Sequence, residues 1–364
     1  MAARLAPAAL ARSSYAELEA YEPGRKPVAL DLSDNTNLAG IPPAAAQILA
    51  AASDPAKSAI VTRYPSLWAS DLKAAVASYL GVPVECVTTG CGSDDVLDSA
   101  VRAFSEPGDR LAFPAPTFAM LPHLAHTNAL EPIEVPLRAR DLDVDADGLL
   151  AADARITYVC SPNNPTGTLA SSAAIDALLE RARGLVIVDE AYADYAASDG
   201  APALARRATT DGRLLVVRTL SKAFGLAGLR VGYAISTPEI AQTLDKSRGP
   251  YKVGRLAENM AVAALTEDLD WVRSRAQDVV VARQRFAELL RSWGLSPIAS
   301  EANFILVAVG DARAAAADLR ARGIGVRPFL AAPGIGDALR ISMAPWSVIA
   351  PVLPAFEEVL RCVS

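Results

Sequence analysis

Short apolar runs alternate with Ala- and Leu-rich helical stretches through the middle of the chain, and this alternation constrains the fold more than any other feature. Most of these runs are continuously apolar, which is typical of strands that helices cover on both faces. The pattern predicts an α/β fold, with a large domain whose mostly parallel sheet is flanked by helices. The predicted strands are 86–90, 110–115, 156–161, 185–191, 214–220 and 229–236, with helices over 93–105 and 172–183 between them.

The pattern changes after Pro250. A long helical region is predicted over 254–293, followed by a strand at 303–309, a helix over 311–322 and a last strand at 338–342. These elements predict a second, smaller α+β domain, and 364 residues are enough for two domains. The expected divisions are an N-terminal arm over 1–30, a large domain over 31–248, and a small C-terminal domain over 249–364 that part of the arm joins.

Composition and charge exclude several classes of function. The 41 acidic residues outnumber the 35 Lys and Arg residues, so the chain lacks the basic excess that would indicate a nucleic-acid or membrane partner. No apolar run reaches the ~18 residues of a transmembrane helix. The four cysteines contain no C-x-x-C pair, which argues against a disulfide framework and a cysteine-ligated zinc site and fits a cytoplasmic location. With only two histidines, we predict no bound metal. The Ala- and Arg-rich N-terminus resembles a transit peptide in composition, but we interpret it as an arm.

Two segments imitate known binding motifs and fail at a defining position. Segment 143–148 resembles the start of a calcium-binding loop, but the position of the final glutamate ligand holds Ala154. We predict a turn and a helix cap there instead. Segment 88–104 resembles a dinucleotide-binding fingerprint, but its third glycine position holds Asp95. The helix that begins near Ser93 still favours a phosphate at its N-terminus.

The strongest local feature is TLSKAFGLAGLRVGY (219–233), in which Lys222 occupies a turn of small residues between two predicted strands. Thr219 and Ser221 precede the lysine and Arg230 follows it, so two hydroxyls and a guanidinium form an anion site beside an amine. A lysine in such a turn is commonly a solvated loop residue. The adjacent anion site instead favours a Schiff base with a phosphorylated aldehyde such as pyridoxal phosphate.

Two further segments supply groups that this cofactor needs. In LVIVDEAY (185–192), Asp189 ends an apolar strand, where a carboxylate is costly unless it is paired. A protonated pyridine nitrogen would be such a partner. In SPNNPTG (161–167), Asn164 lies in a tight turn, and alone this segment indicates no more than a turn. Together with Asp189, Lys222 and Arg230 in this order, it indicates a cofactor site.

These motifs resemble those of the class I/II, fold-type I pyridoxal-phosphate aminotransferases, most closely the histidinol-phosphate aminotransferase branch, from about Tyr21 to Arg340. The resemblance implies an enzyme that takes a small-molecule amino donor and a 2-oxo acid acceptor. It implies Lys222 as the lysine that carries the cofactor, Asp189 as the partner of the pyridine N–H, and Tyr192 as a third catalytic residue. The other implied cofactor-binding residues are Gly92, Ser93, Asp94, Thr219, Ser221 and Arg230 around the phosphate, Phe118 on the ring face, and Asn164 at the ring 3-oxygen beside Tyr192.

Assembly and substrate binding also follow from the resemblance. Tyr64, in TRYPS, matches a tyrosine that reaches the cofactor phosphate of the partner subunit, which implies a homodimer with shared active sites. Arg340, in LRIS, matches the arginine that receives the acidic group of the substrate, and Arg327, in GVRPF, matches a second arginine of the histidinol-phosphate branch. The alternative for Arg327 is a strand cap with a local salt bridge. Tyr21 matches a tyrosine of the N-terminal arm that closes over the substrate, and Asn164 is expected to contact the substrate as well as the cofactor.

Several departures from the branch keep the donor open. The chain has SDNTNLAG (33–40) where the branch reads like SNENPYG, LRISMAP (339–345) where it reads like LRISVG, and Lys252 and Gly254 where it more often has Asn. We expect these changes to line the mouth of the substrate site. The open alternatives are an aromatic or specialised amino-acid aminotransferase and a threonine-phosphate-type decarboxylase of the same fold. A regulator built on this fold would carry a DNA-binding domain before it, and only a short arm precedes it here.

Overall fold

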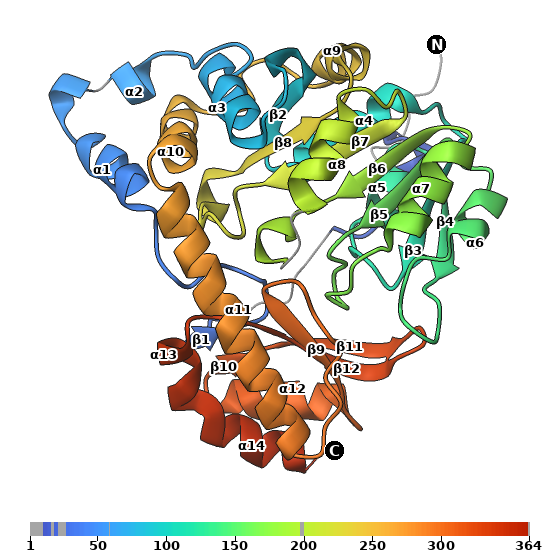
Figure 1. Ribbon diagram of the computed structural model, residues 1–364, viewed down its shortest axis with the longest axis vertical. Helices are drawn as coiled ribbons and strands as arrows, with labels where there is room; N and C mark the ends of the chain where they lie inside the picture. Colours follow the sequence, from blue (N-terminus) through green and yellow to red (C-terminus); the bar gives the residue numbers. More distant parts are fainter. Residues whose placement is uncertain (1–9, 16–17, 21–26, 58, 197–199, 363–364) are drawn as a thin grey trace, which may run out of the picture.

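The larger part of the molecule is built around a seven-stranded sheet (Figure 1). The computed structural model describes residues 10–15, 18–20, 27–57, 59–196 and 200–362. The strands of this sheet are β2 (Val87–Cys91), β3 (Arg110–Ala115), β4 (Glu131–Pro136), β5 (Ile156–Cys160), β6 (Leu185–Asp189), β7 (Leu214–Thr219) and β8 (Val231–Ile235). Their order is β2-β8-β7-β6-β5-β3-β4. Strand β8 runs antiparallel to both of its neighbours, β2 and β7, and the other pairs of strands in this sheet are parallel. The predicted mostly parallel sheet is therefore confirmed.

Helices cover both faces of this sheet, which explains why its central strands are continuously apolar. Along β6, Val186 and Val188 belong to one buried cluster, whereas Leu185 and Ile187 belong to another. Successive side chains of a strand point to opposite faces, so each face has its own core. The helices of this part of the chain are α1 (Pro43–Ala51), α2 (Ala59–Thr62), α3 (Ser70–Leu80), α4 (Ser93–Phe104), α5 (Leu121–Thr127), α6 (Ala146–Ala151), α7 (Ser172–Arg181), α8 (Gly200–Ala208), α9 (Pro238–Ser247) and α10 (Arg255–Thr266).

A second, smaller sheet lies at the other end of the molecule (Figure 1). Its strands β9 (Phe304–Ala308), β11 (Arg327–Ala332) and β12 (Gly336–Ser342) pair antiparallel in the order β11-β12-β9. The remaining helices are α11 (Leu269–Ser292), α12 (Ala312–Ala321), α13 (Trp346–Ile349) and α14 (Leu353–Arg361). Figure 1 shows α11 running from the part that holds the larger sheet to the part that holds the smaller one. The short strand β1 (Leu30–Asp31) pairs with β10 (Ile324–Gly325), so the chain before α1 joins the C-terminal part.

The predicted helical region 254–293 is two helices, α10 and α11, with a break at Glu267 and Asp268. The carboxylate of Asp268 accepts hydrogen bonds from the backbone N–H groups of Ala44 (2.8 Å) and Ala45 (3.4 Å) at the start of α1. A carboxylate is favourable at a helix N-terminus, where backbone N–H groups lack partners within the helix. The break therefore has a tertiary cause, because Asp268 serves as the acceptor for another helix.

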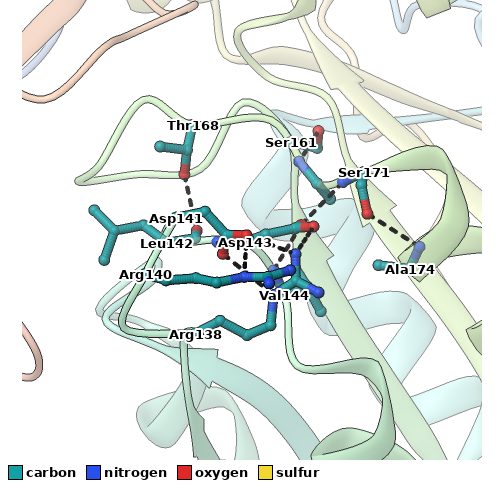
Figure 2. A network of polar contacts seen from close by, with 11 residues as sticks. Arg138, Arg140, Asp141, Leu142, Asp143, Val144, Ser161, Thr168, Ser171 and Ala174 are labelled. Atoms are coloured by element: carbon teal, nitrogen blue, oxygen red, sulfur yellow. Dashed lines mark hydrogen bonds and ion pairs between the residues drawn. The ribbon is translucent and has the colours of Figure 1, made fainter.

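The acidic segment after β4 forms a turn and a helix cap, as predicted. Asp145 accepts a hydrogen bond from the Gly148 N–H (3.1 Å) at the start of α6. Figure 2 shows Asp143 in a network with Arg138 and Ser171, in which its carboxylate pairs with the guanidinium at 2.7 Å and accepts from the Ser171 N–H at 3.0 Å. This network joins the loop to the start of α7. Within the described ranges, no group of His, Cys, Asp and Glu side chains is suited to hold a metal ion.

None of the described helices is both long enough and apolar enough to span a lipid bilayer.

Candidate active site

A cavity of about 390 Å³ lies where the parallel strands of the larger sheet end, and the smaller sheet borders it. The carboxyl ends of β5, β6 and β7 and the start of α4 reach it from one side, and β11 and β12 from the other. In open α/β sheets, ligands bind beyond the carboxyl ends of the strands. Twelve of the predicted site residues line this cavity: Ser93, Asp94, Phe118, Asn164, Asp189, Tyr192, Thr219, Ser221, Lys222, Arg230, Arg327 and Arg340.

Lys222 extends its amine into this cavity from the turn after β7. Its Nζ donates a hydrogen bond to the backbone oxygen of Asp34 (3.2 Å) and lies 5.7 Å from the centre of the Tyr192 ring. Burial, and then the positive charge of Arg340, lowers the pKa of the Lys222 amine to about 8. An amine with a pKa near neutrality can serve as both base and acid.

Asp189 ends β6 with its carboxylate buried at the edge of the cavity. It accepts hydrogen bonds from the Tyr158 hydroxyl (2.8 Å) and the Ala191 N–H (3.0 Å), and both donors are neutral. Burial raises the pKa of this carboxyl to about 6. Within the described part of the chain no Lys or Arg forms an ion pair with Asp189. A cationic group in the cavity would therefore find a carboxylate that lacks a cationic partner.

An anion site lies between the start of α4 and the Lys222 turn. Arg230 Nη1 donates to Ser221 Oγ (3.4 Å), and Thr219 Oγ1 donates to the same oxygen (2.8 Å). Gly92 precedes α4 with φ +85°, and a Cβ there would lie 2.5 Å from Arg230 Nη2. The left-handed backbone favours glycine at 92, and a side chain there would also push the guanidinium of Arg230 away. Ser93 is the first residue of α4, where backbone N–H groups favour a bound phosphate.

Asp94 adds a negative charge beside this anion site. Its carboxylate lies 3.3 Å from Arg230 Nη2, and both side chains are about half exposed. A phosphate at the site would compete with Asp94 for the guanidinium. Because exposed ion pairs are weak, on the order of 1 kcal/mol or less, this competition costs little.

Asn164 and Tyr192 face the cavity beside Lys222, and each is held by a residue from elsewhere in the chain. Asn164 Oδ1 accepts a hydrogen bond from Arg340 Nη1. The Tyr192 hydroxyl accepts from Asn35 Nδ2 (3.0 Å), and its ring packs edge-on against Phe304 of β9, with ring centres 5.1 Å apart. The smaller sheet thus contacts both residues directly.

Arg327 and Arg340 lie directly opposite each other on the antiparallel strands β11 and β12. Opposed residues of an antiparallel pair project from the same face, so both side chains reach the cavity. Arg340 is buried, its Nη2 donates to the Ser33 oxygen (2.6 Å), and its guanidinium stacks near Phe304 (5.5 Å) and Phe329 (5.8 Å). Two guanidiniums at one wall suit an anion with more than one charge.

Three predicted residues are not among those that line the cavity, and one of them is Gly92, which lies beside Arg230 at the start of α4. Tyr64 does not line it; its side chain is 79% exposed and its ring lies 5.0 Å from that of Tyr251. Tyr21 lies outside the described residues.

The departures from the branch pattern are only partly where we expected them. Ser33, Asp34 and Asn35 line the cavity, but Lys252 and Met343 do not. Lys252 instead pairs with Asp95 at 2.7 Å, and Met343 is buried in the core. The expectation that all of these changes border the substrate is therefore wrong for Lys252 and Met343.

Several cavity residues were not predicted from the sequence as site residues. Thr117, Cys160 and Phe329 line the wall, and Tyr158 lies behind Asp189. Phe329 had a usable signal, because it lies two residues after Arg327 and so shares its face of the strand. Cys160 had one too, since it ends an apolar run as Asp189 does, and the structure makes the two residues register partners.

The chain has extensive similarity to known aminotransferases. A model of the "Aminotransferase class I and II" family matches residues 27–347. "Histidinol-phosphate aminotransferase 1" of Cupriavidus pinatubonensis is 36% identical over 343 residues, which cover 91% of this chain and 88% of that protein. An aromatic amino acid aminotransferase of Nocardia farcinica is also 36% identical, over 332 residues that cover 87% of this chain and 90% of that protein. Relatives of equal identity thus carry names with different donors.

Among solved structures, the histidinol-phosphate aminotransferase from Sinorhizobium meliloti in complex with pyridoxal-5'-phosphate is similar over 100% of this chain and 99% of that chain, with a TM-score of 0.85 and 27% identity.

Proposed function

The chain belongs to the class I and II aminotransferase family, and on this premise we propose that it moves an amino group from histidinol phosphate, or a related amine or amino acid, to 2-oxoglutarate. The family depends on pyridoxal phosphate. The pairing of Arg327 with Arg340 on one wall of the cavity carries the proposal for a phosphorylated donor. A phosphate monoester carries nearly two charges and three acceptor oxygens, so it can use both guanidiniums. A carboxylate is satisfied by one.

The residues at the cavity fit pyridoxal phosphate. Asp189, whose hydrogen-bond donors are neutral, suits the protonated ring nitrogen, and the site formed by Ser93, Thr219, Ser221 and Arg230 suits the phosphate. When bound, this cofactor supplies an aldehyde carbon that reacts with amines and a ring that withdraws electrons from the substrate α-carbon. A cationic ring beside Asp189 would lower the pKa of that carboxyl below its value in the free protein and keep it charged.

Lys222 carries the proton transfers in this proposal. Its amine, with a pKa lowered to about 8, is neutral in about one molecule in ten at pH 7, a far larger share than at the ordinary lysine pKa of about 10.4. Nζ would take the proton from the substrate α-carbon as a base and would then give a proton back as an acid. The keto product leaves before 2-oxoglutarate enters, so the kinetics are ping-pong.

An aromatic amino-acid donor is the second candidate. Phe118, Met120, Leu124 and Phe329 give the cavity an apolar share that suits an aromatic side chain. The equal identity to an aromatic amino acid aminotransferase supports the same reading. Arg340 alone would then receive the carboxylate of the donor.

We also propose a homodimer with shared sites, divided into the arm and two domains as predicted from the sequence. Large apolar side chains lie exposed around α1 and α2, at one edge of the molecule in Figure 1. A gathering of exposed apolar residues in one region is typical of a protein interface. In this proposal a second copy of the chain covers the region, and the exposed Tyr64 reaches the cavity of that copy. The exposed residues are Ile41, Leu49, Val61, Tyr64, Leu67 and Trp68. The cytoplasmic location stays a prediction.

A donor screen tests the function. Purified protein with pyridoxal phosphate and 2-oxoglutarate is offered histidinol phosphate, Phe, Tyr and threonine phosphate, and glutamate formation is measured, with Lys222→Ala as the inactive control. We expect the highest kcat/KM on histidinol phosphate. No activity on it beside good activity on Phe or Tyr would favour the aromatic candidate, and carbon dioxide release from threonine phosphate would favour a decarboxylase.

A further inference from the structure

Asn35 holds a buried position between the smaller sheet and the cavity. It has a left-handed backbone (φ +60°), which asparagine tolerates better than most residues. The residue is 1% exposed, and its backbone oxygen accepts from Asn303 Nδ2 (3.0 Å). Its side chain lies between Ser342, at the end of β12, and Tyr192. The conformation and burial together fix where its amide group can reach.

The hydrogen bonds that connect Ser342, Asn35 and Tyr192 have one possible direction. The Asn35 backbone N–H, which can only donate, donates to Ser342 Oγ (2.8 Å). The Ser342 hydroxyl therefore directs its single proton to Asn35 Oδ1 (2.9 Å). This leaves Nδ2, a donor only, facing the Tyr192 hydroxyl at 3.0 Å. The Tyr192 oxygen must accept there.

Tyr192 then has its own proton left to donate. A phenol carries one O–H donor, and its oxygen is already an acceptor for Asn35. The hydroxyl makes no other hydrogen bond with the described residues, and its residue lines the cavity. The edge-on contact with Phe304 holds the ring, so the hydroxyl proton can change direction only by rotation about the C–O bond.

We propose that Asn35 and Ser342 are positioning residues that make the Tyr192 hydroxyl donate its proton into the cavity. This rests on the proposed function, because the acceptor in the cavity is the ring oxygen of bound pyridoxal phosphate. A donated hydrogen bond draws negative charge from that oxygen. Without it, a proton on the nitrogen beside the oxygen is held more tightly, and the pH midpoint of the visible absorbance of the bound cofactor moves upward.

The test measures this pH midpoint in the protein loaded with pyridoxal phosphate. Asn35→Asp keeps the size of the side chain and tolerates the left-handed backbone, but it places an acceptor where Nδ2 was. The Tyr192 proton then turns to the introduced carboxylate and away from the cavity, so we expect the midpoint to rise by about one pH unit. Ser342→Ala adds no charge and frees the amide to turn over, so we expect a smaller rise.

Two controls separate this role from general damage or added charge. Ser236→Ala removes the hydroxyl of another serine that is 1% exposed and bonds only to a backbone oxygen in its neighbourhood, and its midpoint should equal that of the parent. In a Tyr192→Phe background, Asn35→Asp should add no further rise, because the hydroxyl through which it acts is gone. An effect of the new charge alone would persist there and would overturn the proposal.

The other possible results of this experiment also support or overturn the proposal. If Asn35→Asp does not fold, as judged by its melting temperature, the neutral Ser342→Ala variant carries the test. Midpoints of Asn35→Asp and Ser342→Ala equal to that of the parent would overturn the positioning role while the proposed function stands. A parent protein that gives no visible absorbance with pyridoxal phosphate would overturn both.

Discussion

Replacing Asp189 with Asn should stabilise the cofactor-free protein while removing most of its activity. The folded protein raises the pKa of this carboxyl to about 6, mainly by burial. The unfolded chain leaves it near 3.9. The folded state therefore binds the proton more tightly, and the stability of the parent falls as pH rises between these two values. Above pH 6 the folded protein holds a charged carboxylate at a destabilising site.

The size of the effect follows from this difference in pKa. About two pKa units correspond to about 3 kcal/mol of unfolding free energy that the parent lacks at pH 8. The two carboxylate oxygens of Asp189 accept one hydrogen bond each, from the Tyr158 hydroxyl and the Ala191 N–H. In Asn one of these oxygens is replaced by a donor, so Tyr158 turns its proton elsewhere and about 1 kcal/mol of unfolding free energy is lost. The net gain of about 2 kcal/mol raises the melting temperature by about 2–3 °C in a chain of this size.

The assay compares melting temperatures of cofactor-free parent and Asp189→Asn between pH 4 and pH 8, beside turnover of the loaded proteins. The gain in melting temperature should be full at pH 8 and shrink as pH falls through 6. Turnover should fall ~100-fold or more, since an amide cannot pair with a cationic ring nitrogen. Asp143→Asn is the matched control. The buried Asp143 carboxylate pairs with Arg138, so this variant should be less stable than the parent. A variant less stable than the parent at pH 8, or a difference independent of pH, would refute the reasoning.

Three further predictions address the other groups of the site. Lys222→Ala with pyridoxal phosphate should lose the visible absorbance that borohydride removes in the parent; a borohydride-sensitive chromophore in the variant would show that another group carries the cofactor. Arg327→Ala should lower kcat/KM by ~10- to 100-fold on a phosphorylated donor and less on a carboxylate donor; equal losses on both would favour an aromatic or specialised aminotransferase. Mixing Lys222→Ala chains with Tyr64→Ala chains should restore some activity through one intact composite site, and no rescue in confirmed heterodimers would count against shared sites.

The sequence predicted the elements that carry the cavity because their signals are local. The run 185–191 is continuously apolar up to Asp189, which places a carboxylate at a strand end without any knowledge of the fold. Strand β4 was missed because it is half exposed and begins Glu131–Pro132, which lowers its resemblance to a strand. The break at Asp268 was missed because its cause lies in α1, far away in the sequence.

The substrate side of the cavity was harder to predict, because its geometry depends on contacts between distant residues. The motif order suggested Arg327 and Arg340, but only strand pairing places them opposite each other. Asn35 lies in SDNTNLAG (33–40), which was singled out only as a departure from the branch pattern, and nothing within this segment marks Asn35 as different from an ordinary turn asparagine. Its importance comes from a left-handed backbone and from partners on β12 and after β6, neither of which leaves a pattern in neighbouring residues.

The docking of the N-terminal segment on the C-terminal part has a consequence for how the chain folds during synthesis. Asn35 and Ser342 are 307 residues apart along the chain. The strands of the larger sheet emerge from the ribosome long before β12 does, and domains generally fold as units in order of synthesis. The segment that carries Asn35 therefore waits without its partner for nearly the whole of translation. A nascent chain halted before β12 would already hold the larger sheet with Asp189, Lys222 and Arg230, but it would lack Arg340 and the partner of Asn35, so the substrate wall of the cavity is the last part to be completed.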